Sequence, residues 1–386
     1  MDGGAQNDAS VVAELAHCKT LGFPSKLKPP PFAAITLCKG RMAAQTLATQ
    51  PLARRQQSFG VSDVIVGTSP LGGIGTSISD AAAADIIEKC VRAGFRDFDT
   101  APLYGLGKAE ERLGEGLRRS GKAAQCRVWT KVGRLIRTTE NVPDPDDIEE
   151  ENVPGKGIYV DSPKDARPVQ DYSWNGAFLS YDDSVRRLGA NIKICGLRCH
   201  DPETKLLESL AVCTGGSLEG LCALRQRHGT EVSIGLNDAD VALRLLQAVQ
   251  SGTQALKIDS IMLAGRWHLL DQTGVEVFRY CSEHSIEVHV AGVYASGMLA
   301  GGALYEYRKP AMAEKKRLQS WAALCAEHSV SLKAAALAFA FLPACVSKVA
   351  VGLAEASLVA ETVALLAEAK AVPLALWRDA VAKGLL

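Results

Sequence analysis

Short apolar runs alternate with helical patterns along this chain, from about residue 60 to its end. Eight of the runs have the length and composition of buried strands. They cover Val64–Gly67, Phe95–Asp99, Arg127–Val132, Ile192–His200, Glu231–Leu236, Ser260–Ala264, Glu287–Val293 and Lys348–Gly352. Continuous apolar runs of this kind are typical of strands that are covered on both faces of a parallel sheet. The alternation therefore predicts parallel strands joined by right-handed helical crossovers.

Polar residues with N-cap character indicate where several of the helices should begin. The predicted starts are Ser79-Asp80 before Ala81–Ala93, Asn237-Asp238 before a helix through Ala248, Tyr181-Asp182, and Glu355, with a last helix from about Leu374 to Lys383. Gly94 ends the first of these helices, as glycine often does at a helix C-terminus.

Eight strand–helix units fit a closed (β/α)₈ barrel, so we predict an α/β TIM barrel that forms one domain over residues 59–386. The structural alternative is a doubly wound open sheet. That fold usually has a G-x-G-x-x-G turn after its first strand. Here the corresponding turn is GTSPLGG, residues 67–73, which lacks that spacing.

Residues 1–58 differ from the rest of the chain. They are rich in Ala, Pro, Gln and Lys, contain Pro29-Pro30-Pro31 and have no sustained periodicity. We therefore expect a disordered N-terminal extension. Its basic and hydroxylated composition from Lys19 onward leaves an organelle transit peptide as an alternative to a cytoplasmic protein. Met42 begins a segment of more ordinary composition, so whether residues 1–41 are native stays open.

One connection within the predicted barrel is long. Residues 134–177, after the third strand, are rich in Asp, Pro and Gly. Long loops in compact domains are usually functional or disordered. Loops that follow the strands form the active face of a barrel. We therefore expect this segment to lie over the substrate, with a mobile insertion as the alternative.

Composition excludes several classes of partner. The 386 residues are 47% hydrophobic and carry no formal net charge, so no nucleic-acid or anionic-membrane partner is expected. No apolar run reaches the roughly 18 residues of a membrane span. The eleven cysteines are dispersed without a C-x-x-C pair, which favours free thiols in a reducing compartment. Cys195, Cys199 and His200 have no partner cluster elsewhere, so no metal site is expected.

Four polar side chains stand at or near the ends of three predicted strands. Asp99 ends the second strand and Tyr104 follows it, Lys131 lies near the end of the third, and His200 ends the fourth. In a parallel barrel these ends meet on one face. Phenol, ammonium, carboxylate and imidazole together can transfer a proton. Each has a structural alternative: a turn cap, a loop aromatic, a snorkelling lysine and a core histidine.

The strings around these residues resemble those of the aldo-keto reductases. In order they are GTSPLGG, DTAPLYG, TKVGR, HDP, LAGRWHLLDQ and SGMLAGG, between residues 67 and 302. They are similar to the sugar 1-dehydrogenase branch, which includes L-galactose, L-fucose and D-threo-aldose dehydrogenases and a pyridoxal dehydrogenase. The resemblance covers about residues 59–386.

The resemblance implies a role for each residue of the set. Tyr104 would be the general acid/base, Lys131 would lower the pKa of its phenol from about 10, Asp99 would pair with Lys131, and His200 would orient the substrate oxygen.

It also implies a nicotinamide cofactor. The matching positions are Ser296, Gly297 and Leu299 after the seventh strand, Gly352 and Leu353 after the eighth, Asn237 at the carboxamide and Glu361 at the adenine. Backbone amides at such glycine-rich strand ends can hold a pyrophosphate. Plain strand-to-helix turning is the structural alternative.

Several positions depart from the family pattern. Thr362 stands where the family has an adenine-binding asparagine, and Ala291 where many relatives have an aromatic residue beside the nicotinamide. Ala354, followed by Glu355, occupies the position of a cation for the 2′-phosphate, so we expect NAD rather than NADP. Arg198 interrupts the fourth strand; if buried, it would need a partner, which the sequence does not identify.

We therefore predict an enzyme that oxidises a free aldose at C1 to the lactone. A dehydrogenase or reductase of another small aldehyde or alcohol, pyridoxal included, is the first alternative. The second is a cofactor-binding regulatory subunit. A small-molecule substrate is the only partner expected, and the oligomeric state stays open.

Overall fold

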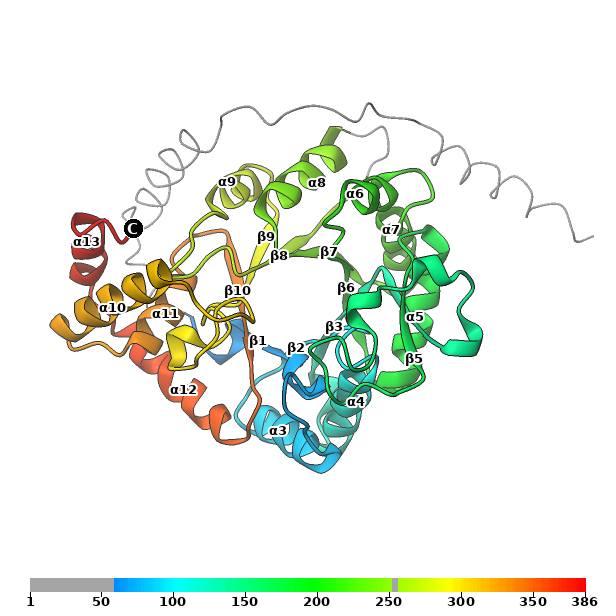
Figure 1. Ribbon diagram of the computed structural model, residues 1–386, viewed down its shortest axis with the longest axis horizontal. Helices are drawn as coiled ribbons and strands as arrows, with labels where there is room; N and C mark the ends of the chain where they lie inside the picture. Colours follow the sequence, from blue (N-terminus) through cyan, green and yellow to red (C-terminus); the bar gives the residue numbers. More distant parts are fainter. Residues whose placement is uncertain (1–58, 252–255) are drawn as a thin grey trace, which may run out of the picture. The chain divides into compact units, whose positions relative to one another are not determined.

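The computed structural model describes residues 59–251 and 256–386. The predicted N-terminal extension, residues 1–58, lies outside the described residues. Within them, eight parallel strands close into a barrel in the order β1-β10-β9-β8-β7-β6-β3-β2 (Figure 1). The strands are β1 Val64–Gly67, β2 Asp97–Asp99, β3 Arg127–Val132, β6 Ile194–His200, β7 Glu231–Leu236, β8 Ser260–Ala264, β9 Glu287–Ala291 and β10 Val346–Gly352. The predicted TIM barrel is confirmed.

Helices surround the barrel on its outside (Figure 1). They are α3 Asp80–Arg92, α4 Lys108–Arg119, α5 Trp174–Leu188, α6 Lys205–Val212, α7 Ser217–His228, α8 Ala239–Ser251, α9 Val275–Glu283, α10 Met312–Glu327, α11 Leu332–Ala340, α12 Ser357–Lys370 and α13 Leu374–Ala382. Short 3₁₀ turns are Val61–Asp63, Ser69–Gly72, Ala123–Gln125, Thr139–Asn141, Pro145–Asp147, Glu150–Asn152 and Met298–Ala300.

Alternation along each strand divides its side chains between two layers. On β1, Val64 and Val66 belong to the large core between strands and helices, whereas Ile65 packs in a small separate cluster with Met262 and Ala350. The small cluster lies on the other side of the strands, inside the barrel. The apolar filling of the interior is thus limited, which leaves room there for polar side chains.

One predicted helix start is wrong. Tyr181-Asp182 was expected to open a helix, but α5 begins seven residues earlier, where the Ser173 hydroxyl accepts a hydrogen bond from the Gly176 amide at 2.9 Å. Ser173 satisfies a free amide of the first turn. Tyr181 instead lies in mid-helix and stacks on His228, with ring centroids 4.6 Å apart. The other predicted starts agree with the structure within two residues.

The segment 134–177 is an ordered insertion rather than a simple loop. It begins with β4 Arg134–Thr138, which pairs antiparallel with β5 Ala166–Gln170. Between these strands the chain crosses to the loop after β1, where Gly75 N donates to Ile158 O at 2.9 Å and Val160 N donates to Gly73 O at 2.9 Å. The insertion therefore joins the ends of β3 and β1 across the face of the barrel at which the strands end. That it lies over the substrate stays a prediction.

No described helix is both long and apolar enough to cross a membrane. The predicted cytoplasmic location stays a prediction.

Gly114 in α4 provides a test of the packing. A β-carbon at this position would lie 2.0 Å from the backbone oxygen of Leu188, at the end of α5. Alanine gains about 1 kcal/mol over glycine in a helix, but overpacking costs about 1–3 kcal/mol or more. A backbone oxygen cannot rotate away, so we expect Gly114→Ala to lower the free energy of unfolding by at least about 1 kcal/mol net. Denaturant unfolding measures the change.

Gly60→Ala is the matched control, because a β-carbon at Gly60 meets nothing within 4 Å and the backbone there is extended, with φ −157°. Its stability should stay within about 0.5 kcal/mol of wild type. A Gly114→Ala protein as stable as wild type would show that α4 and α5 can separate freely.

Candidate active site

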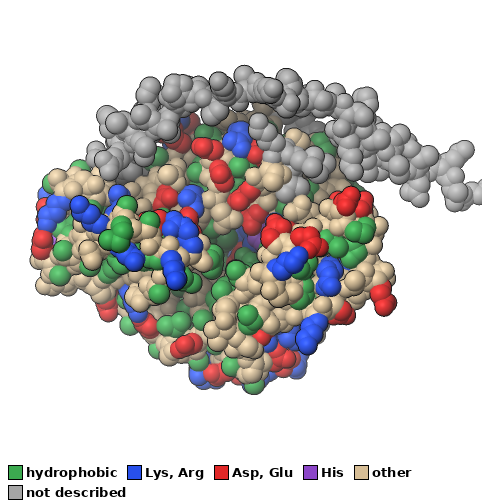
Figure 2. Space-filling view, viewed as in Figure 1, with side chains coloured by type: hydrophobic (Ala, Val, Ile, Leu, Met, Phe, Trp, Pro, Cys, Tyr) green, Lys and Arg blue, Asp and Glu red, His purple; other side chains and the backbone are tan. Residues whose placement is uncertain are grey.

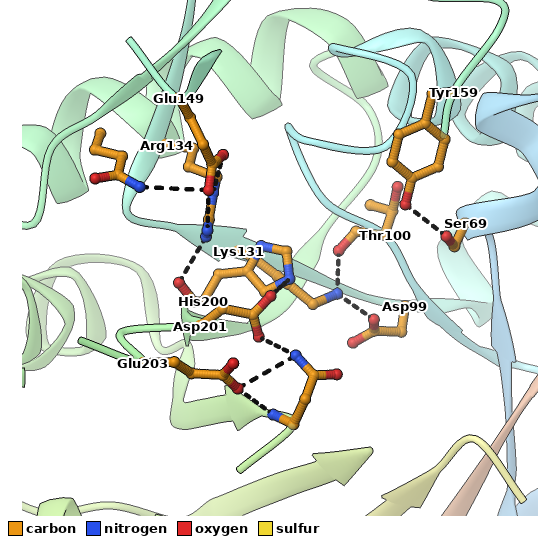
Figure 3. Close-up of polar contacts among 12 residues, drawn as sticks. Ser69, Asp99, Thr100, Lys131, Arg134, Glu149, Tyr159, His200, Asp201 and Glu203 are labelled. Carbon is orange, nitrogen blue, oxygen red and sulfur yellow. Dashed lines mark hydrogen bonds and ion pairs between the residues drawn. The ribbon is translucent and has the colours of Figure 1, made fainter. Parts of the chain in front are cut away.

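The ends of three strands bring the predicted catalytic side chains together. Asp99 is the last residue of β2, Lys131 lies one residue before the end of β3, and His200 is the last residue of β6. Figure 3 shows the three side chains at one face of the barrel. Tyr104 reaches the same place from the turn after β2. Gly107 N donates to Pro102 O at 2.7 Å and holds that turn in shape.

Asp99 and Lys131 form a buried ion pair. The Lys131 ammonium donates to Asp99 Oδ1 and to the carbonyl oxygen of Thr100, the latter at 2.7 Å. Only 2% of the lysine side chain and 4% of the aspartate side chain are exposed. Burial alone would raise the pKa of Asp99, but Lys131 and Arg198 outweigh it and hold that pKa below its usual value. The carboxylate is therefore ionised at neutral pH.

Tyr104 lies against this pair and against His200. The Lys131 ammonium is 4.7 Å from the centroid of the Tyr104 ring. The His200 ring approaches edge-on, with centroids 5.9 Å apart. Burial, and then the Asp99 carboxylate, raise the pKa of the Tyr104 phenol well above its usual value. In the protein alone the net shift is thus upward and Tyr104 is protonated at neutral pH, while the lowering of this pKa by Lys131 stays a prediction.

His200 is held through its backbone and kept neutral. Its carbonyl oxygen accepts hydrogen bonds from Arg134 Nη1 at 2.8 Å and from the Tyr172 hydroxyl. Burial lowers the pKa of the imidazole well below its usual value, and the charges of Arg134 and Lys131 act in the same direction. A neutral imidazole can donate one hydrogen bond and accept another.

Asp201 adds a second titratable group beside His200. Its Oδ2 lies 3.4 Å from His200 Nε2, and its backbone adopts a left-handed conformation with φ 45°. Burial raises the pKa of this carboxyl to about 7, against the opposing charge of Arg134, although 23% of the side chain stays exposed. Sequence reasoning missed this residue, even though it follows His200 directly.

Asn237 lies next to this carboxyl. Its side-chain amide donates to Asp201 Oδ1 at 3.1 Å and to Glu203 Oε1 at 3.2 Å (Figure 3). Asn237, which we expect at the nicotinamide carboxamide, thus contacts Asp201, the residue that follows His200.

The insertion supplies further side chains that sequence reasoning missed. Arg134 donates to both oxygens of Glu149, at 2.7 and 2.6 Å, as well as to the carbonyl of His200. The Tyr159 hydroxyl is 2.8 Å from Ser69 Oγ, and its ring lies 5.9 Å from that of Tyr104. The available signal was the position of Arg134, directly after Lys131-Val132-Gly133, and the isolated aromatic residues in a polar segment.

The predicted pyrophosphate segments lie at neighbouring strand ends. Gly352 ends β10 and pairs in register with Gly67 at the end of β1. The following helix, α12, has Ala356 at its N-cap and no side-chain cap, and its Leu358 and Val359 amides donate to the carbonyl oxygens of Glu355 and Ala356. Gly297 has a left-handed backbone, as does Ser296. Free amides at a helix N-terminus suit a phosphate group.

The two predicted leucines are core residues. Leu299 and Leu353 are almost fully buried and pack with the barrel core. They could reach a cofactor only through their backbone.

The region where we expect the adenine contains a buried hydroxyl without a hydrogen-bond partner among the described residues. This hydroxyl belongs to Tyr294. Burial, and then the nearby Glu361 carboxylate, raise its pKa. Glu361 is paired with Lys333 at 2.5 Å. Thr362 is not free, because its hydroxyl donates to the Leu358 carbonyl at 2.7 Å. These groups fit an adenosine ligand that Glu361 and Tyr294, but not Thr362, would contact.

No group of three or more His, Cys, Asp or Glu side chains that could hold a metal ion occurs within residues 59–251 and 256–386. Of the cysteines considered as ligands, Cys199 is fully buried against Ser217, with the sulfur 3.4 Å from the serine hydroxyl.

Comparison with known proteins gives consistent matches. The model of the Aldo/keto reductase family matches residues 63–372. The D-threo-aldose 1-dehydrogenase of a Pseudomonas species is 34% identical over 296 residues, which are 74% of this chain and 83% of that protein. The pyridoxal 4-dehydrogenase of Microbacterium luteolum is 29% identical over 88% of this chain and 98% of that protein. The L-galactose dehydrogenase of Arabidopsis thaliana is 26% identical over 80% and 85%.

Solved structures agree with the fold. An aldo-keto reductase from Bacillus halodurans in its holo form superposes with a TM-score of 0.58 at 20% identity, over 81% of this chain and 91% of that one. The glycerol dehydrogenase of Gluconobacter oxydans has a TM-score of 0.56 at 18% identity, over 81% and 86%. The family match spans most of the barrel, and the chain therefore belongs to the aldo/keto reductase family, in its sugar dehydrogenase branch, and is an oxidoreductase.

Proposed function

We propose that this protein oxidises a free aldose at C1 to the lactone, with NAD as the hydride acceptor. The observation that carries the proposal is the buried Asp99–Lys131 pair beside a protonated Tyr104 and a neutral His200. The names of two relatives, a D-threo-aldose 1-dehydrogenase and an L-galactose dehydrogenase, support an aldose as substrate. Retention of all four polar side chains argues against a purely regulatory role.

The reaction removes a hydride from C1 and a proton from the C1 hydroxyl, so that the lactone carbonyl forms and two electrons leave with the hydride. A bound oxidised nicotinamide would supply the hydride acceptor and, before the transfer, a positive ring charge beside the substrate. The proton needs an acceptor at the sugar oxygen. Tyr104 is the group we assign to this role, because its ring lies close to both the Lys131 ammonium and the His200 ring.

The charges around Tyr104 determine when it can act as a base. In the protein alone, burial and Asp99 keep the phenol protonated, which is the form that donates a proton in the reverse reaction. Oxidation needs the phenolate, which nearby positive charge stabilises. Lys131 supplies such a charge from within the barrel, and Asp99 holds its ammonium in position.

His200 and Asp201 provide a route for the proton toward solvent. A neutral His200 can donate to the substrate oxygen through one ring nitrogen and accept through the other. Asp201, which has a pKa of about 7, lies 3.4 Å from His200 Nε2. Because part of the Asp201 side chain is exposed, a proton that reaches it can pass to water.

The surroundings of the site suit a polyhydroxylated substrate. The face in view in Figure 2 is hollowed near its centre, with acidic and basic side chains around the hollow. Tyr159, from the insertion, lies beside Tyr104 with its hydroxyl bound to Ser69. Hydroxyl, carboxylate and amide groups from Tyr159, Asp201 and Asn237 can each bond a sugar hydroxyl. Such positioned polar groups discriminate strongly against substrates that lack the matching hydroxyl.

Pyridoxal is the second candidate substrate. The pyridoxal 4-dehydrogenase aligns along 98% of its own length, and the Tyr104 and Tyr159 rings offer aromatic surface to a planar substrate. Both candidates use the same proton and hydride chemistry, so the choice depends on the substrate pocket alone.

A substrate panel tests the proposal. Purified protein is incubated with NAD and, separately, L-galactose, L-fucose, D-arabinose and pyridoxal, and NADH and lactone are measured. We expect NADH from at least one aldose, with lactone in equal amount. Tyr104→Phe should reduce turnover by about 10²–10⁴-fold while its NADH affinity, read by tryptophan fluorescence, stays within about twofold, because the phenol oxygen is needed only for proton transfer.

Tyr181→Phe is the control, since Tyr181 lies on α5 with its ring stacked on His228, away from the strand ends that carry the site. It should behave as wild type. NADH from pyridoxal alone would reject the aldose, and a Tyr104→Phe protein with more than about a tenth of wild-type turnover would reject the role of the phenol.

The cofactor preference forms a separate prediction. Glu355 bonds the Ser357 hydroxyl at the start of α12, and Ala354 offers no cation. A 2′-phosphate there would meet a carboxylate and no positively charged hydrogen-bond donor. Where such a donor is present, its hydrogen bond contributes roughly 1.5–3 kcal/mol to binding. We expect kcat/KM to favour NAD by at least about tenfold, and Ala354→Arg to narrow the ratio.

Ala354→Gln, which adds length without charge, should leave that ratio unchanged. Equal efficiencies with the two cofactors would mean that a cation from elsewhere, such as Lys333 beside Glu361, meets the 2′-phosphate. In that case the placement of the adenosine is wrong.

The raised pKa of Asp201 predicts a pH-dependent stability. The folded protein holds this proton up to about pH 7, whereas an unfolded aspartate loses it near pH 3.9. The contribution of this group to stability is therefore lost as the pH rises from about 4 to about 7, because the unfolded state releases the proton first, and above about pH 7 the loss is complete. Asp201→Asn keeps an acceptor for Asn237 and should raise the unfolding midpoint by about 2–4 °C at pH 8.

At about pH 4.5 the same substitution should raise the midpoint much less, by about 1 °C. This pH is little more than half a unit above the unfolded pKa of about 3.9, so only a small part of the linked destabilisation has developed. Midpoints are compared at one scan rate. An equal rise at both pH values would indicate that the gain is not due to ionisation of Asp201.

A further inference from the structure

Arg198 is a buried cation at the centre of the barrel. It lies on β6, two residues before His200, so the two side chains point to the same side of the strand. In register it stands between Lys131 on β3 and Ser233 on β7. None of its side chain is exposed. A charge buried this deeply needs compensating partners.

The guanidinium has a partner on every side. Nε donates to Asp99 Oδ2 at 2.8 Å, Nη1 donates to Ser233 Oγ at 2.6 Å, and Nη2 lies 2.9 Å from His289 Nδ1. Its carbon lies 4.3 Å from the centroid of the Trp129 ring.

The neighbouring backbone makes room for this arrangement. A β-carbon at Gly196, directly across from Trp129 in the sheet, would come within 2.1 Å of the indole. The absence of a side chain there leaves room for the indole, which lies over the guanidinium.

Asp99 consequently accepts hydrogen bonds from two cations, one at each carboxylate oxygen. Oδ1 binds Lys131 and Oδ2 binds Arg198. A buried ion pair is weak evidence for stability, since well-packed apolar residues often stabilise as well or better. The geometry therefore points to an electrostatic role. We propose that Arg198 is a positioning residue which fixes the Asp99 carboxylate and adds a positive charge that sets the pH range in which Tyr104 exchanges its proton.

The proposal rests on the proposed function. It depends on the charges that face the site from each packed element. From β2, β3 and the turn after β2 these are Asp99, Lys131 and Tyr104; from β6 and its following loop, His200 and Asp201; from β9, His289; from the insertion, Arg134 and Tyr159; and from the segment before α10, Tyr307. Burial lowers the pKa of Lys131, Asp99 opposes that effect and Arg198 adds to it. Arg198 thus offsets part of the Asp99 charge that otherwise holds the proton on Tyr104.

Substitution of Arg198 by glutamine tests the charge while retaining a hydrogen-bond donor for Asp99. Without the arginine, only Lys131 compensates the charge of Asp99, and the phenolate of Tyr104 forms at higher pH. We expect the rising limb of kcat/KM for oxidation to move up by about one pH unit, the scale of one nearby charge at an effective dielectric constant of about 20. Activity at pH 7 should therefore fall about tenfold, and the loss should shrink toward alkaline pH.

Two variants separate charge from packing. Arg198→Lys restores a positive charge, and its limb should return to within about 0.3 pH unit of wild type. Ser233→Ala removes one hydrogen bond of the guanidinium and no charge, so its limb should not move. A loss in Arg198→Gln that is equal at every pH, or an upward shift in Arg198→Lys as large as that in Arg198→Gln, would overturn the proposal. The lysine variant also decides the matter if the glutamine variant does not fold.

The reverse reaction separates this inference from the proposed function. In reduction of an aldehyde such as pyridoxal, the same phenol acts as the acid, so the falling limb should also move up by about one pH unit in Arg198→Gln. Wild-type protein that reduces pyridoxal but oxidises no aldose would contradict the proposed substrate, while the position of this limb would still support or reject the role of Arg198.

Discussion

The Asp99 carboxylate is the interaction on which the rest of the site depends. It lies inside the barrel, almost without contact with water, and two cations on neighbouring strands share it. Removal of either cation would leave a buried charge partly uncompensated. This one carboxylate holds the Lys131 ammonium next to the Tyr104 ring. It also binds the Arg198 guanidinium inside the barrel. A TIM barrel usually fills its interior with branched apolar side chains, and here a chain of charged and polar groups takes part of that space.

Most of the fold could be predicted because the buried strands are continuous apolar runs. Four of the eight strands have the predicted bounds, and the others differ only at their ends. Once the barrel is known, its geometry brings Asp99, Lys131 and His200 to one face, because parallel strands end together. The predicted start of α5 was wrong because, in the sequence alone, an exposed acidic residue in the middle of a helix cannot be distinguished from an N-cap residue. Only the contact between Ser173 and Gly176 distinguishes the two.

Two features of the site could not be predicted, because they depend on contacts between residues far apart in the sequence. The partners of Arg198 come from β2, β7 and β9, and no local pattern marks Ser233 or His289 as its neighbours. The effect on Tyr104 also differs from the expectation. The lysine was expected to favour the phenolate, yet it gives its hydrogen bonds to Asp99 and Thr100, and burial dominates. The charge state of Tyr104 in the set of Asp99, Tyr104, Lys131 and His200 therefore depends on which of the other residues Lys131 pairs with most closely.

The uncapped start of α12 has a consequence for the lifetime of the protein. Ala356 has no side chain that could accept from the first turn of that helix, and the amides of Leu358 and Val359 donate only to the carbonyl oxygens of Glu355 and Ala356. An anion that binds there adds a charged acceptor at the positive end of the helix and stabilises only the folded state, by an amount that grows with the logarithm of its concentration. If the pyrophosphate of a dinucleotide is that anion, the abundance of the enzyme in a cell would follow the supply of its own cofactor, because proteases remove the molecules that unfold.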